Sequence, residues 1–152
     1  MTHQGATGAG DFIRYVTGLP YPLTAVPRAR LDVTLETIRE RIRAEASWTC
    51  RGGMLAYLDE QVASMDTPGK LAGQLDAPFK TVEDWAKANG TKPQDITLGE
   101  FGMIRHEYGN AYVMPAEHRA AYVRDMIARA GAHGFSWSVW GYGDAFGIVD
   151  AL

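Results

Sequence analysis

Cysteine and long apolar runs are nearly absent from this 152-residue chain. The single cysteine, Cys50, excludes an internal disulfide and leaves the redox compartment open. We interpret it as an unreactive thiol, because it has no partner cysteine. No apolar stretch approaches the ~20 residues that a membrane-spanning helix requires, and residues 1–6 lack the basic and apolar segments of a secretory signal. We therefore expect no membrane partner.

Concentrated charge and metal-binding patterns are also lacking. The formal net charge is -3 and Lys and Arg form no cluster, which argues against a nucleic-acid partner. No HExxH or CxxC pattern occurs, so the sequence predicts no metal site. The glycines of segment 5–10 follow no predicted strand, which disfavours a phosphate-binding loop. With 46% hydrophobic and 22% charged residues, the composition is that of an ordinary globular protein.

Proline and glycine divide the first half of the chain. They interrupt the segment up to about Arg30, which we predict to be mainly loop. Apolar residues spaced three and four apart then predict helices over residues 31–46, 54–65 and 78–89. We expect the Thr67-Pro68-Gly69 sequence to end the second of these helices and Asn89-Gly90 to end the third.

The second half alternates between short apolar runs and a helical pattern. We predict a strand over 96–101, a loop through 108–110, a helix opened by Pro115 and closed at Gly131 or Gly134, and a strand over 135–140. Near-continuous apolar strands separated by a helix are typical of an α/β protein with a parallel sheet buried on both faces. The chain contains no internal repeat or linker, so we predict one unit or a piece of one.

The end of each predicted strand carries a residue suited to sugar chemistry. Glu100 lies between Gly99 and Gly102, whose small size allows close approach of a ligand. Trp140 ends the second strand, and an indole can pack against the apolar face of a sugar ring. Trp137, three residues earlier, faces the opposite side of a strand, and we interpret it as core facing the helix. A glycosidase needs two carboxylates, and only Glu100 is a good candidate here.

Three segments together resemble glycoside hydrolase family 5, the cellulase family. They are THQGA (2–6) with GLPYP (18–22), LGEFG (98–102), and GFSWSVW (134–140) with FGIVD (146–150). In order, they are similar to that family's loop after the sixth strand, its seventh strand, which carries the nucleophile, and its eighth strand. The resemblance covers essentially the whole chain.

The resemblance implies an α/β fold that is the C-terminal part of a (β/α)8 TIM barrel, about strands 7 and 8 with their preceding helices, and incomplete. Residues 1–152 would then be a partial glycoside hydrolase catalytic domain. Glu100 would be the nucleophile, while Trp140 and His3 would bind the substrate. The acid/base glutamate would lie outside the chain, so we expect this fragment to have little activity alone.

By the same resemblance, the parent protein is a retaining endo-β-1,4-glucanase that acts on a polysaccharide by double displacement. A β-glucan is the expected substrate, with mannan left open, and no cofactor is implied. Enzymes of this kind are usually exported, so the parent is expected to be secreted or periplasmic. His106 and Glu107, after the nucleophile strand, either contact distal sugars or are simply exposed. We interpret His118 and His133 as residues of a helix surface.

Two other interpretations of the protein's function stay open. One is a non-catalytic carbohydrate-binding or interaction module in which Trp137, Trp140 and Tyr142 form an aromatic platform. It requires exposed tryptophans and a Glu100 without a partner. The other is a small α/β domain unrelated to sugars.

Overall fold

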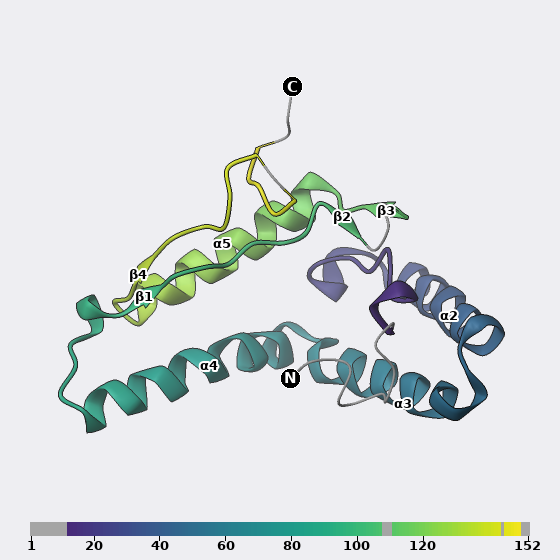
Figure 1. Ribbon diagram of the computed structural model, residues 1–152, viewed down its shortest axis with the longest axis horizontal. Coiled ribbons are helices and arrows are strands. Elements are labelled where there is room, and N and C mark those ends of the chain that lie inside the picture. The colour runs from purple at the N-terminus through teal and green to yellow at the C-terminus, as the bar shows by residue number, and fades with distance from the viewer. Residues whose placement is uncertain (1–11, 108–110, 144, 150–152) are drawn as a thin grey trace.

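The computed structural model describes residues 12–107, 111–143 and 145–149, and these are mostly helical (Figure 1). Within them, 62% of residues are in helices and 6% in strands. The α-helices are α2 (Arg28–Glu45), α3 (Trp48–Met65), α4 (Pro68–Ala88) and α5 (Ala116–Ala132). The strands are β1 (Thr97–Leu98), β2 (His106–Glu107), β3 (Tyr112–Val113) and β4 (Ser136–Trp137), and the 3-10 turns are η1 (Phe12–Arg14), η2 (Leu23–Ala25) and η3 (Pro93–Asp95).

The predicted fold class, α/β as the C-terminal part of a TIM barrel with strands 7 and 8, is wrong. The described residues form two sheets of two strands each, and every strand is two residues long. Barrel strands are packed on both sides, whereas both residues of β4 are exposed and β1 is only half-buried at Leu98. The apolar runs pair over a short stretch, and helices take up most of the described residues.

The pairing of β1 with β4 is parallel, with Thr97 opposite Ser136 and Leu98 opposite Trp137. Helix α5 makes the connection between the two strands, as parallel strands require. An antiparallel hairpin, β2–β3, precedes α5 and was not predicted. The β1–β4 pair lies at one end of α5 and the β2–β3 hairpin lies at the other (Figure 1). The predicted burial of a parallel sheet on both faces does not occur.

The larger core lies between the N-terminal segment, α2 and α3. The predicted stripe of Leu35, Ile38 and Ile42 on α2 is fully buried, as are Met54 and Leu58 of α3. Residues of the opening loop complete this core, because Phe12, Tyr15 and Leu23 pack into the same cluster. The described part of the segment predicted as loop, from Phe12 onward, is thus an anchored part of the fold.

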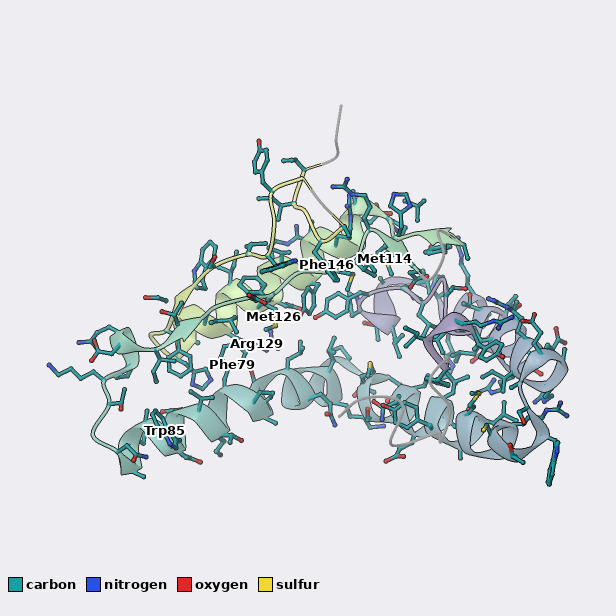
Figure 2. All side chains as sticks on the ribbon, in the orientation of Figure 1. Phe79, Trp85, Met114, Met126, Arg129 and Phe146 are labelled. Carbon is teal, nitrogen blue, oxygen red and sulfur yellow. The ribbon has the colours of Figure 1, made fainter. Side chains whose placement is uncertain are left out.

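A smaller core joins α4 to α5. Helix α4 begins at Pro68, where the Thr67 hydroxyl accepts a hydrogen bond from the Lys70 amide. Phe79 of α4 packs with Ala130 of α5 and with Phe135. Figure 2 shows Phe79, Met126 and Arg129 between the two helices.

An ion pair and a hydrogen bond join the two helices beside this smaller core. The Arg129 guanidinium lies 2.8 Å from the Asp76 carboxylate, and His133 Nδ1 lies 3.0 Å from Glu83 Oε2. The His133 ring also stacks on the Phe79 ring at 5.5 Å. His133 is therefore part of the α4–α5 contact rather than the surface residue that the sequence suggested. None of the described helices combines the length and apolar character needed to cross a membrane.

Candidate active site

The backbone ladder between the two parallel segments continues beyond β1 and β4 and is interrupted at Gly99–Glu100. The bonds run from the amides of Ser136, Ser138 and Trp140 to the carbonyls of Ile96, Leu98 and Phe101, each 2.9 Å long. The donors are evenly spaced at every second residue, whereas the last acceptor follows the previous one by three residues. One extra residue is therefore accommodated at Gly99–Glu100, which is the arrangement of a β-bulge.

This interruption leaves the Glu100 side chain exposed. Glu100 forms no hydrogen bond or ion pair with any other residue that the structure describes. The amide of Trp140 bonds to the carbonyl of Phe101, the residue after Glu100, so the two predicted site residues lie on neighbouring backbone segments. The Trp140 side chain is 47% exposed and is available to a ligand. A bulge re-aims a side chain away from the ladder, and bulges are over-represented next to active sites.

Phe101, the residue after Glu100, holds the interrupted segment in place by packing into the protein. Its side chain is buried, and its ring meets the Trp137 ring edge-on at 6.2 Å. Gly102 fits closely against the next loop, because a Cβ there would lie 3.2 Å from both the Cβ and the carbonyl oxygen of Phe146. Trp137 faces α5, as predicted, but it is 45% exposed and is not core.

The loop that carries the predicted substrate-binding residue is described only in part. His3 lies outside the described residues, as does the rest of segment 1–11. Further along, the Tyr21 hydroxyl donates to Asp125 Oδ2 at 2.7 Å, and His118 Nδ1 lies 2.8 Å from the Tyr21 carbonyl oxygen. These contacts fasten the loop to α5, so His118 has a tertiary contact that the sequence did not reveal.

For Glu107 the sequence left two alternatives, a contact with distal sugars or an exposed position, and in the structure it is a half-buried residue with a tertiary hydrogen bond. Its Oε2 accepts a hydrogen bond of 2.6 Å from the amide of Gly18, which joins β2 to the opening loop. Gly18 has a φ of 78°, a conformation that glycine adopts without strain. Burial raises the pKa of the Glu107 carboxyl, and the Gly18 hydrogen bond partly opposes this. β2 is at the far end of α5 from the β1–β4 pair (Figure 1), so Glu107 does not serve the Glu100 site.

Replacing Glu107 by glutamine is expected to stabilise the protein progressively as the pH rises above about 4, where an unfolded glutamate ionises. The folded-state pKa is raised, so the native carboxyl binds its proton more tightly than the unfolded one, and wild-type stability falls as pH increases through this window. Glutamine does not titrate and can still accept the Gly18 bond. Thermal unfolding at about pH 4 and pH 7 measures the effect, and an equal difference between the two proteins at both pH values would contradict it.

The described residues contain no group of three or more His, Cys, Asp or Glu side chains positioned to hold a metal ion. The Glu100 site therefore consists of a carboxylate, an indole and backbone groups. The indole can bind a sugar ring, and the carboxylate can form a bond to the anomeric carbon of that sugar. Cleavage of a glycosidic bond would also need a second carboxyl group for proton transfer.

No protein-family model matches this chain. No curated protein matches it either. Two solved structures are similar to it over part of its length. One, named an endoglucanase, is 33% identical over 52% of this chain and 22% of its own, with a TM-score of 0.41. The other, a hyperthermophilic endo-β-1,4-glucanase in complex with substrate, is 30% identical over 55% of this chain and 24% of its own, with a TM-score of 0.42.

The matched part of this chain thus spans less than a quarter of either endoglucanase. The similarity is a partial one to endoglucanases, and it does not single out glycoside hydrolase family 5.

Proposed function

We propose that this chain provides the nucleophile side of a retaining β-1,4-glucan hydrolase. The observation that carries the proposal is the position of Glu100, exposed at an interruption of the backbone ladder and on the segment next to Trp140. A nucleophilic carboxylate must be ionised and accessible to the anomeric carbon. Glu100 is exposed and has no ion pair among the described residues, which suits this role.

In the proposed reaction, a Glu100 carboxylate oxygen forms a bond to the anomeric carbon as the glycosidic C–O bond breaks. A second carboxyl group gives its proton to the leaving oxygen, and the same group then removes a proton from the water that hydrolyses the ester. In retaining enzymes the two carboxyl groups lie roughly 5–5.5 Å apart. We assign no residue of this chain to the acid/base role. The proposal places that carboxyl group elsewhere in the whole enzyme.

Trp140 would hold the reacting sugar. A pyranose ring presents an apolar C–H face that packs on an indole, and the indole N–H can donate a hydrogen bond to a hydroxyl. His3 remains a proposed contact from the opening loop. The two similar chains are named endoglucanases, and β-1,4-glucan is the substrate class that we carry to this protein as part of the proposal. An exported protein, secreted or periplasmic, would meet such a substrate.

Hydrolysis of carboxymethyl-cellulose tests the proposal directly. The protein, in the longest form in which it is produced, is compared with its Glu100→Gln variant by the release of reducing ends. Activity that depends on Glu100 supports the proposal. Activity that is the same in both proteins would rule out Glu100 as the nucleophile.

The exposure of the aromatic side chains favours a second candidate function, a carbohydrate-binding module without catalysis. Trp137 and Trp140 are 45% and 47% exposed, and Tyr142 is 74% exposed. Three exposed aromatic residues within six positions are suited to stacking against sugar rings. Under this function, binding would not need Glu100 at all.

Replacing Trp140 by alanine is expected to weaken binding of cellohexaose about tenfold, which corresponds to about 1.4 kcal/mol, because the stacking surface is lost. Isothermal titration calorimetry gives the affinity, with Trp85→Ala as the matched control, since Trp85 is an exposed tryptophan of α4. Equal affinity in the two variants would exclude Trp140 from the sugar site. Binding without any hydrolysis in the longest form of the protein would favour the module.

A further inference from the structure

Helix α5 has two apolar faces, and only one of them is covered by another helix. Met126 and Ala130 belong to the small core that faces α4. Ala120, Val123 and Ile127, spaced three and four residues apart, form a second face that adjoins the first around the helix. The apolar surface of α5 is therefore wider than the part that α4 covers, and an apolar helix face is normally buried.

The second face borders a cavity of about 410 Å³ beneath the C-terminal segment. Trp137, Val139, Phe146 and Ile148 form the opposite wall, and Figure 2 shows Phe146 beside α5. The volume is within the range of small-molecule sites, roughly 300–1,000 Å³. Because the walls are mostly apolar, a sugar would lose hydrogen bonds to water on entering, whereas an alkyl chain would not.

The charged residues that line the cavity are all basic. Arg119 and Arg124 are the only charged residues among the lining residues, and both come from α5. The Arg124 side chain is exposed and forms no hydrogen bond or ion pair with another described residue. A guanidinium forms strong charge-assisted hydrogen bonds with a carboxylate. An apolar ligand with one anionic end therefore matches both the apolar walls of the cavity and the exposed guanidinium of Arg124.

We propose that this cavity binds a medium-chain carboxylate, with the alkyl chain between α5 and the C-terminal segment and the carboxylate at Arg124. The site is separate from Glu100, so its existence does not depend on the proposed glucan chemistry. Selectivity would come from two sources. The walls would reject strongly polar compounds, and Arg124 would favour an anion over a neutral or cationic head group.

Trp137 lines the cavity and supplies the signal for a test on the full chain. Its fluorescence is followed during titration with octanoate, octanol and octyltrimethylammonium, which share one alkyl chain and differ in the head group. We expect saturable binding of octanoate, with binding of the other two at least about tenfold weaker, since a hydrogen bond between two charged groups is stronger than one to a neutral group. The signal should disappear in Trp137→Phe, because the other tryptophans do not line this cavity.

Two variants separate this site from non-specific binding. Arg124→Ala should weaken octanoate about tenfold and leave octanol unchanged, whereas the control Arg30→Ala, an exposed arginine of α2, should change neither. Ala120→Trp should fill the cavity and abolish binding, with circular dichroism as the check that α5 remains folded. Equal binding of octanoate and octanol, or full octanoate binding in Arg124→Ala, would overturn the proposal. Arg124 is exposed, so its variant carries the test even where Ala120→Trp fails to fold.

Discussion

Substitution of Glu100 by glutamine is expected to reduce hydrolysis of carboxymethyl-cellulose by roughly 10³-fold or more, since loss of the nucleophile in other hydrolases costs up to about 10⁶-fold. Glutamine has nearly the same shape as glutamate but cannot form the glycosyl ester. The side chain is exposed and forms no hydrogen bond or ion pair with another described residue that its replacement would break. The fold should therefore be unchanged, and the loss should be in kcat rather than in stability.

The control for this experiment is Glu40→Gln, which changes an exposed glutamate of α2 in the same way. A mechanism-based label provides an independent readout. A cellobioside with fluorine at C2 and an activated leaving group should leave its sugar esterified to Glu100, which peptide mass spectrometry would detect. An ester on a different carboxylate, or a Glu100→Gln variant as active as the wild type, would remove Glu100 from the nucleophile role.

Replacement of Ile42 by alanine is expected to lower the free energy of unfolding by about 2–5 kcal/mol. Ile42 is completely buried in the core between the opening loop, α2 and α3. Removing its outer carbons leaves a space that the surrounding side chains can close only in part. For a small protein this is a large share of a total stability of roughly 5–15 kcal/mol.

Urea unfolding followed by circular dichroism measures this loss. Val33→Ala is the matched control, because Val33 is on the same helix but is 68% exposed. Its effect should stay within about 0.5 kcal/mol, as is usual for surface positions. Similar losses in both variants would mean that the α2 stripe is not the centre of the core.

Helix boundaries were predicted less well than helix positions. The helix predicted over 54–65 begins at Trp48, and the helix predicted over 78–89 begins at Pro68. Proline is favoured in the first turn of a helix as well as just after one. The Thr67-Pro68-Gly69 sequence does both here, since it ends α3 and starts α4. Pro78, interpreted as a helix start, lies inside α4.

The strands were the least predictable part of the fold. The segments 96–101 and 135–140 are apolar enough for strands of a fully packed parallel sheet, yet each contributes a strand of only two residues. Strand formation depends on a partner and on layers that cover both faces, neither of which is encoded in the segment itself. The sequence contains no pattern that predicts the β2–β3 hairpin, because strands of two residues are too short to show alternation of polar and apolar side chains.

Local spacing in the sequence was sufficient to determine the buried stripe of α2 and the start of α5 after Pro115. Helical periodicity depends on near neighbours, which is why these features can be read residue by residue. Only the tertiary structure decided the bulge at Gly99–Glu100, the role of Glu107 beside Gly18 and the cavity beside α5. Each of these depends on how two segments distant in sequence meet, and that is set by packing over the whole chain.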